Sequence, residues 1–407
     1  MDILPILATL RRHKVTATLL ILQIALTCAI VCNAVFLITQ RLHRMDMPSG
    51  VAEHELVHLR LADIGRRDDE KARTAEDLAL LRQIPGVTEV ASVNQVPFGN
   101  SSNNSGIKLD PKQSQSTLNM TTYFGENLAQ AFGVQLVSGR MLQPDDYMDF
   151  DAVVHAAQAG DLKHLPSVIV ITQALAERLW PGQSALGKQI YLGSEVPLRV
   201  VGVVRGLVRP SIWDDAMAQY TGILPVRVFD GNYILRTAPG ERDRVLKAAI
   251  AALKKSDPHR VVIAQHIWDD MRSDFFRQDR AMAVLLVGVC IALLVVTALG
   301  IVGLGSFWVA QRRRQIGVRR ALGATRANIL HYFQTENFLL ATIGIGLGMV
   351  LAYGINLFLM QHYELPRLPA IYFPVGAVAL WLIGQVAVLG PALRAAAVPP
   401  VVATRSV

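Results

Sequence analysis

The stretch from Gln311 to Arg326 has the strongest chemical character in this chain of 407 residues. It reads Q-R-R-R-Q-I-G-V-R-R-A-L-G-A-T-R and holds six arginines and no acidic residue. Arg312, Arg319 and Arg326 are seven residues apart, and this spacing predicts a basic stripe along one helix. The simplest interpretation is a membrane loop that its positive charge keeps in the cytosol. That interpretation explains the charge but not the order I-G-V-R-R-A-L-G-A.

Two residues of this stretch predict where helices end and begin. Gly323 suits the end of a helix, because glycine readily adopts the left-handed backbone conformation found there. Thr325 suits the N-cap of the following helix, since its hydroxyl can accept a hydrogen bond from a free backbone N–H. We therefore expect a defined helical shape here.

The segment from Gly182 to Gln189, G-Q-S-A-L-G-K-Q, is close to the phosphate-binding pattern G-x-x-x-x-G-K-[ST]. Gln189 stands where the pattern needs a hydroxyl to bind Mg²⁺. The segment also follows a predicted helix that ends at Trp180, whereas a phosphate-binding loop follows a strand. We therefore expect no nucleotide binding and no ATP hydrolysis by this chain.

No other group of residues predicts a catalytic residue, a cofactor or a metal site. Cys28 and Cys32 are one helical turn apart, but no histidine or carboxylate is nearby, which favours small buried residues over metal ligands. Glu336 stands near the start of an apolar segment. We interpret it as an acid that interacts with the preceding arginines rather than as a proton carrier, because the other apolar segments offer it no ionisable partner.

The apolar runs that flank these residues predict a membrane protein. The chain is 52% hydrophobic and 18% charged, and its charges leave four runs of about 20 or more apolar residues, the length that spans a bilayer. The predicted fold is four transmembrane α-helices with a large α+β periplasmic domain inserted between the first and second. The predicted order is a cytosolic amphipathic leader (1–14), transmembrane helix 1 (15–40), the periplasmic domain with two subdomains (41–265), a stalk and transmembrane helix 2 (266–310), a cytosolic loop (311–334), transmembrane helix 3 (335–360), a short periplasmic loop (361–370), transmembrane helix 4 (371–393) and a cytosolic tail (394–407).

Alternation and capping patterns predict the elements of the periplasmic domain. The predicted strands are 54–62, 87–93, 167–171, 198–204, 233–237 and 261–265, and the predicted helices are 74–84, 174–180 and 241–255. Thr74 and Asp77 resemble a capping box at the start of the first helix. Residues 94–115 predict a mobile loop, and 266–280 predict a charged helix that leads straight into the second span as a stalk.

The distribution of charge excludes a nucleic-acid surface. The net charge of the chain is +8, but residues 41–280 carry 28 Lys and Arg against 29 Asp and Glu, a net charge of −1. Residues 311–326 contribute +6, and the segments at the two ends contribute +2 each. The excess positive charge therefore lies beside apolar spans, as the positive-inside rule predicts for cytosolic segments.

Small residues in the second and third spans allow two helices to approach closely. Packing within the chain and a dimer interface are equally compatible with this pattern. The glycines concerned are Gly300, Gly303, Gly305, Gly344, Gly346 and Gly348.

Taken together, these motifs resemble those of the permease subunits of MacB/FtsX-type ABC transporters, the type VII or mechanotransmission class, over nearly the whole chain. Residues 312–326 are similar to the family's cytosolic loop, R-R-R-E-I-G-I-R-R-A-L-G-A-T, with Gln315 where the family usually has Glu. G-V-Q-L-V-S-G-R at 133–140 and the segment 171–202 resemble the macrolide-exporter-type periplasmic core domain. In that comparison, Gly182 and the residues after it form the family's P-G-x-x-x-L-G-K turn. P-A-L-R-A-A-A at 391–397 is similar to the family's terminal motif.

The resemblance implies a division of labour. A separate cytosolic ATPase dimer would hold ATP and Mg²⁺ and push on the loop after the second span, and this chain would hold no cofactor. The long second helix would carry that motion to the periplasmic domain. The residues that the resemblance assigns to coupling with the ATPase are Arg312, Arg313, Arg314, Ile316, Gly317, Arg319, Arg320, Leu322, Gly323, Ala324 and Arg326.

The resemblance also implies partners and a location. We expect a multi-pass protein of the bacterial inner membrane, in contact with lipid, with both termini in the cytosol. A second permease copy or a paralogue is needed, because four spans supply half of the usual pair. Export of a small molecule or peptide through a tripartite system would add a periplasmic adaptor and an outer-membrane channel. Alternatives are extraction of lipoproteins or lipids from the inner membrane, mechanical activation of a periplasmic hydrolase, and a membrane-anchored sensor. The cytosolic pieces are too short for a sensor's output domain.

Overall fold

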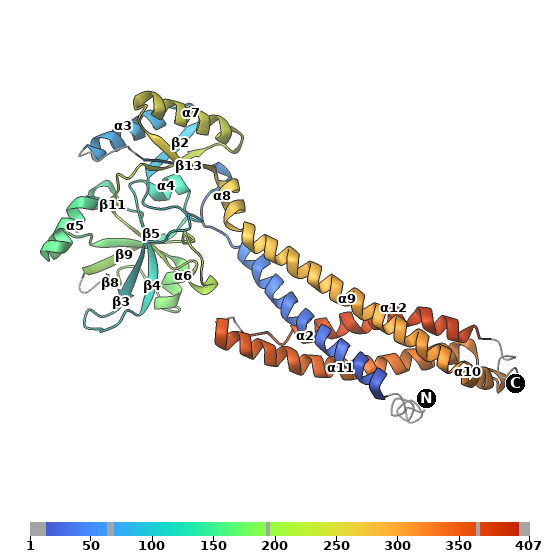
Figure 1. Cartoon of the computed structure of the whole chain (residues 1–407). Coiled ribbons are helices and arrows are strands. Elements are labelled where there is room, and N and C mark those ends of the chain that lie inside the picture. The colour runs from blue at the N-terminus through green and yellow to red at the C-terminus, as the bar shows by residue number, and fades with distance from the viewer. Residues whose placement is uncertain (1–13, 63–68, 193–195, 364–366, 399–407) are drawn as a thin grey trace. The chain divides into compact units, whose positions relative to one another are not determined.

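The computed structural model describes residues 14–62, 69–192, 196–363 and 367–398. The chain forms two compact units (Figure 1). The membrane unit comprises Met1–Met45 and Gln278–Val407, and the β-rich unit comprises Asp46–Arg277. The predicted amphipathic leader lies outside the described residues, apart from its last residue, and so does the tail beyond residue 398.

Four helices of the membrane unit are long and apolar enough to cross a membrane. They are α2 (Lys14–Met45), α9 (Arg277–Gln311), α11 (Arg326–Tyr363) and α12 (Tyr372–Ala396). The prediction of four apolar spans is confirmed. The helices are longer than the predicted spans, because polar turns extend them beyond the apolar runs. The third helix begins at Arg326, inside the segment that was predicted as a loop.

Polar contacts between the helices fix their directions. Gln23 Nε2 on α2 donates to the carbonyl oxygen of Val296 on α9 at 3.1 Å, and the Thr27 and Thr297 hydroxyls are 2.8 Å apart. Asn33 Nδ2 on α2 donates to the carbonyl oxygen of Ala352 on α11 at 3.1 Å. Arg41 on α2 also pairs with Asp279 on α9, so α2 and α9 are antiparallel. Ile24 on α2 lies against Gly344 on α11, so α2 and α11 are parallel.

Helices α11 and α12 are antiparallel and pack against each other. The rings of Phe338 on α11 and Trp381 on α12 stack at 5.5 Å, and Trp381 Nε1 donates to Thr342 Oγ1 at 3.2 Å. The four helices therefore alternate in direction. The start of α2, the end of α9, the start of α11 and the end of α12 lie at one end of the membrane unit.

Several of the small residues lie where helices meet. A Cβ on Gly348 would lie 2.5 Å from the Cβ of Cys28, and one on Gly344 would lie 2.8 Å from the Cβ of Ile24. Gly300 lies against Gln23 and Gly305 against Pro391 in the same way. By contrast, Gly303 and Gly346 have no described atom within 4 Å of such a Cβ. Most of these glycines thus serve packing within the chain.

The β-rich unit contains a four-stranded antiparallel sheet, here called sheet A, in the order β13-β1-β12-β2. Helices α3 and α7 cover one face, where Leu59, Leu235 and Val245 are among the core residues. The opposite face carries His58, Arg60 and His266 among smaller or apolar side chains such as Ala264. The bounds are β1 Leu56–Ala62, β2 Val87–Ser92, β12 Asn232–Thr237, β13 Val261–Ile267, α3 Glu70–Arg82 and α7 Arg242–Ser256.

The second sheet, sheet B, has seven strands in the order β5-β9-β7-β10-β4-β3-β8. An additional β8–β9 pairing joins six of these strands into a closed ring around an apolar core. The bounds are β3 Asn104–Lys108, β4 Leu118–Phe124, β5 Leu136–Gly139, β7 Val168–Thr172, β8 Gln189–Leu192, β9 Val196–Val204 and β10 Thr221–Leu224. Helices α4 (Leu128–Phe132), α5 (Phe150–Ala159) and α6 (Gln173–Leu179) and the short pair β6 (Met148–Asp149) and β11 (Val226–Arg227) complete the unit.

Three local predictions for this unit are wrong. Helix α3 begins at Glu70, and Thr74 and Asp77 are buried inside it instead of capping it, because Asp77 binds Arg260 and the hydroxyl of Tyr233. The segment predicted as a mobile loop contains strand β3, which sheet pairing with β4 stabilises despite its polar sequence.

The predicted stalk is not one continuous helix. Helix α8 (Trp268–Phe275) stops at Phe276, and α9 begins one residue later. Trp268 and Phe276 are both buried, and the ring of Phe276 lies 5.5 Å from that of Phe98. The apolar side chains of this segment are thus anchored in the β-rich unit. The many charged residues of 266–280 had instead led to the prediction of a stalk.

Gly348→Ala tests the packing of the membrane unit. The new methyl group would lie 2.7 Å from the carbonyl oxygen of Ala25, so the helices must separate slightly. We expect a loss of about 1–3 kcal/mol and a lower thermal midpoint in detergent. Gly346→Ala, two residues away, has room for its methyl group and should leave the midpoint unchanged or raise it. Equal midpoints for the two variants would contradict this account.

Candidate coupling surface and a neighbouring cavity

The predicted cytosolic stretch contains a separate short helix, α10 (Arg313–Ala321). Helix α9 ends at Gln311, and α10 follows after Arg312. Gly323 then has a φ of +96°, the left-handed conformation expected for a helix end. Thr325 Oγ1 accepts a hydrogen bond from the backbone N–H of Asn328 at 3.2 Å, as an N-cap should.

The predicted basic stripe is wrong, because its three arginines lie on different parts of the chain. Arg312 lies between α9 and α10, Arg319 is on α10, and Arg326 starts α11. The turn at Gly323 interrupts the helix that the seven-residue spacing assumed. Each arginine consequently has its own environment.

Arg312 and Glu336 form a buried ion pair that joins the start of α10 to α11. Arg312 Nη1 donates to both carboxylate oxygens of Glu336, at 3.0 and 3.1 Å. The two side chains are 7% and 2% exposed, and the guanidinium also lies over the ring of Trp308. Glu336 therefore interacts with an arginine of the preceding stretch, as expected from its position.

Arg319 and Arg320 hold α10 from its other end. Arg320 Nη1 donates to the carbonyl oxygens of Ala396 and Val398 at 3.1 and 2.7 Å, at the carboxyl end of α12. A cation is favourable there, because the last carbonyls of a helix are free and carry partial negative charge. The guanidinium of Arg319 lies 4.9 Å from the centre of the Tyr332 ring.

The underside of α10 is apolar and buried. Ile316 packs with Val309 of α9, Phe333 of α11 and Ala395 of α12, and Gly317 is buried beside it. Helix α10 is thus fixed to three of the long helices at once.

The outer face of α10 and of the turn after it is exposed. Leu322 is 83% exposed and Val318 44%. Arg313, Arg314 and Gln315 are exposed on the first turn, and Gly323 and Arg326 are exposed at the other end, with Ala324 half-buried. We call this face the α10 surface. Arginine is enriched in protein–protein interfaces, and Leu322 and Val318 add apolar surface beside the arginines of this face.

The residues predicted for coupling therefore fall into two groups. Arg312, Ile316 and Gly317 are buried and position α10, with Arg319 and Arg320 assisting. The others form the α10 surface. Position 315, where the sequence departs from the resembled pattern, belongs to the exposed group.

The near-phosphate-binding segment is a turn between α6 and β8. Lys188 Nζ donates to Gln183 Oε1 at 2.6 Å and lies 5.2 Å from the centre of the Trp180 ring. The lysine is therefore engaged with its own turn rather than directed at a phosphate cradle.

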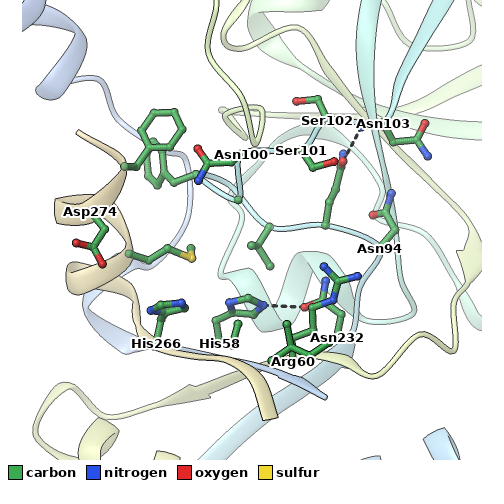
Figure 2. Close-up of a pocket in the computed structure, with 18 of the residues that line it drawn as sticks. His58, Arg60, Asn94, Asn100, Ser101, Ser102, Asn103, Asn232, His266 and Asp274 are labelled. Carbon is green, nitrogen blue, oxygen red and sulfur yellow. Dashed lines mark hydrogen bonds between the residues drawn. The ribbon is translucent and has the colours of Figure 1, made fainter. Parts of the chain in front are cut away.

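The β-rich unit contains a cavity of about 690 Å³ over the face of sheet A opposite α3 and α7 (Figure 2). His58 and Arg60 of β1 line it together with His266 of β13 and Asn232 of β12. Residues 94–103 form the opposite wall, and α8 forms one end. No sequence motif had indicated this site. Its signal was the two-residue spacing of His58 and Arg60, which places both on one face of a strand.

His58 is a buried, neutral group in this cavity. Its Nε2 lies 2.7 Å from Asn232 Oδ1, which can only accept, so Nε2 carries the proton and Nδ1 is an acceptor. Nδ1 is buried and has no hydrogen-bond partner in the described part of the chain. The ring stacks on that of His266, with 6.1 Å between centres. Burial lowers the pKa of His58 from 6.5 to about 4.

Two family models match this chain. The MacB-like periplasmic core domain matches residues 16–253, and the FtsX-like permease C-terminal region matches residues 287–400. The chain is 28% identical over 325 residues to the uncharacterised ABC transporter permease YvrN of Bacillus subtilis, which covers 74% of this chain and 77% of YvrN.

The chain is also similar to larger proteins. It is 26% identical over 238 residues to the macrolide export ATP-binding/permease protein MacB of Chromobacterium violaceum, which covers 57% of this chain and 34% of that protein. This chain thus matches about a third of that relative's length. The crystal structure of the periplasmic region of MacB from Actinobacillus actinomycetemcomitans aligns over 55% of this chain and 94% of that structure, with 16% identity and a TM-score of 0.34.

Removing Glu336 alone should destabilise the membrane unit more than removing the whole ion pair. Glu336→Leu leaves the Arg312 charge buried without its partner, and we expect a loss of about 3–5 kcal/mol. The double variant Arg312→Met/Glu336→Leu should regain most of it. Arg314→Met, an exposed control, should change stability by less than about 0.5 kcal/mol. Thermal midpoints in detergent measure this, and a double variant no more stable than Glu336→Leu would refute the pairing.

His58 should make the protein less stable in mild acid. Below pH 6.5 the unfolded chain binds a proton at His58, whereas the folded chain does so only near pH 4. Stability due to this group is therefore lost as the pH falls from 7 to 4, by up to about 3 kcal/mol. In His58→Gln the thermal midpoint should fall less over this range than in the wild type. His155→Gln, at an exposed position, should behave like the wild type, and the same slope in all three proteins would rule out this role.

Proposed function

Because this chain belongs to the MacB/FtsX-type family of ABC transporter permeases, we propose that it is a membrane subunit driven by a separate ATPase. One observation supports a separate ATPase: the segment closest to a phosphate-binding loop lacks the Mg²⁺-binding hydroxyl at Gln189.

The observation that carries the proposal is the α10 surface. An ATPase dimer that changes shape on binding ATP needs a firm point of contact on the permease. Leu322 gives it an apolar anchor, and Arg313 and Arg314 give it cations for acidic side chains. Arginines are enriched among the residues that account for most of the binding energy in protein interfaces.

The contacts beneath the α10 surface provide the route by which force enters the membrane unit. A push on α10 acts on α11 through Arg312 and Glu336, and on α12 through Arg320. It acts on α9 directly, because α10 follows it in the chain. Helix α9 has 35 residues and is therefore about 50 Å long, from Gln311 beside α10 to Arg277 just after α8. ATP-driven movement would thus reach the β-rich unit along one continuous helix.

We place the α10 surface and both termini in the cytosol of a bacterial inner membrane, and the β-rich unit in the periplasm. The six arginines of residues 311–326 favour the cytosolic side for α10. Since the four helices alternate in direction, the start of α2 and the end of α12 lie on that same side.

We propose export of a small molecule or peptide as the transport reaction, with a second permease copy or paralogue. A periplasmic adaptor and an outer-membrane channel would complete the system. Relatives named for macrolide export support efflux over the alternatives of lipoprotein or lipid extraction and hydrolase activation.

Leu322→Asp should uncouple the permease from its ATPase. A carboxylate in place of the exposed leucine removes the apolar anchor, while the 83% exposure of the site means that folding is unaffected. With the cognate ATP-binding subunit co-expressed, we expect at least tenfold less co-purified ATPase and a matching loss of ATPase activity in lipid. Leu322→Met keeps the apolar anchor and should retain both. Normal complex formation by a folded Leu322→Asp protein would overturn the proposed surface.

A further inference from the structure

The cavity over sheet A contains an arginine without an acidic partner. Arg60 is the one exposed residue within β1 apart from the half-buried Ala62 at its end, and its side chain reaches the cavity (Figure 2). In the described part of the chain, no salt bridge pairs its guanidinium with a carboxylate. Asp230 experiences the charge of Arg60 without contacting it, and burial raises the pKa of Asp230 to about 6. An uncovered cation of this kind is an available binding group for an anion.

The register of sheet A leaves room above this cation. Arg60 pairs with Asn232 on one side and with Ala264 on the other. Directly paired residues project from the same face of a sheet, and the methyl group of Ala264 is too short to cover the guanidinium. His58 and His266 form the next pair along this face. The face therefore presents one fixed cation beside two imidazole rings.

The opposite wall of the cavity is held rigidly by side-chain amides. Asn94 bonds to the carbonyl oxygen of Thr122 and to the N–H of Phe124, and Gln95 bonds to Thr122 and to the N–H of Asn103. These amides are occupied in building the wall. Ser101, also on this wall, makes no described side-chain hydrogen bond and remains available to a ligand (Figure 2).

The end of the cavity formed by α8 and the residue pair after it combines apolar side chains with the ion pair of Asp274 and Arg277, whose charged atoms lie 3.7 Å apart. Phe98, Met271 and Phe275 line it, and the rings of Phe98 and Phe275 lie 5.2 Å apart. Phe98 is buried in the left-handed backbone conformation, with a φ of +63°, which a bulky residue rarely adopts. Its other ring contacts, with Phe276 and Trp268, hold it in place. The cavity thus combines a cation, hydrogen-bonding groups and an aromatic surface.

We propose that this cavity binds a small organic carboxylate with an apolar, aromatic body. The carboxylate would bind Arg60, and the aromatic body would contact Phe98 and Phe275. A volume of about 690 Å³ accommodates a ligand of drug size. This inference deepens the proposed function by naming the ligand class that the β-rich unit recognises. Binding is argued from the cavity alone, and only the transport of the bound ligand rests on the proposed function.

Dansyl-phenylalanine and its uncharged analogue dansyl-phenylalaninamide test the proposal. The two differ only in the carboxylate, and both fluoresce more strongly in an apolar site. With the full chain in lipid nanodiscs and no ATPase, we expect the acid to bind at least tenfold more tightly than the amide. In Arg60→Gln this preference should disappear, and the affinity for the amide should remain. Arg178→Gln, at an exposed position outside the cavity, should keep the wild-type preference.

A second variant tests the location. Ala264→Leu places a larger side chain beside Arg60 and should weaken binding of both compounds at least tenfold, with an unchanged thermal midpoint. Equal affinities of the wild type for acid and amide, or an unchanged preference in Arg60→Gln, would overturn the proposal. Leu322→Asp should bind dansyl-phenylalanine normally, so failure of this site and failure of the coupling surface give different results.

Discussion

The buried ion pair between Arg312 and Glu336 constrains the membrane unit where α9, α10 and α11 meet. Both charges are buried, so removing one side chain would leave the other charge in a poorly solvated place. The pair fixes where α9 gives way to α10 and ties that point to α11. With this end in place, Arg320 can reach the free carbonyls at the end of α12. The exposed face of α10 is therefore a product of contacts beneath it.

The β-rich unit also contains buried residues that fix the structure and accessible residues that are positioned by them. The side chains of Asn94 and Gln95 form hydrogen bonds within the wall of the cavity, and Phe98 packs against other aromatic rings. Arg60, by contrast, has no such ties and faces the cavity. In both units, residues whose hydrogen bonds and packing contacts are all made within the protein hold the structure rigid. The exposed residues beside them are free to bind other molecules. The side chains that make few contacts within the protein are therefore the candidates for binding a partner or a ligand.

Sequence patterns predicted the four long helices because an apolar run of that length has few other structures available to it. Gly323 and Thr325 were correctly assigned to a helix end and an N-cap, since both roles depend on local backbone chemistry. The fate of the arginines could not be predicted in this way. Arg320 binds residues 76 and 78 positions away, and nothing local distinguishes it from the exposed Arg314. The cavity was missed for a similar reason, because His58, Asn100 and His266 meet only after sheet A has formed.

The link between Arg320 and the end of α12 has a consequence for biosynthesis. Helix α10 leaves the ribosome well before Ala396 and Val398 exist, so its position is incomplete while the last helix is being made. At about 5–20 residues per second, that interval lasts several seconds. A nascent chain therefore acquires the finished α10 surface only after α12 has joined the other helices. Under the proposed function, the ATPase would then engage only permease molecules whose membrane unit is fully assembled.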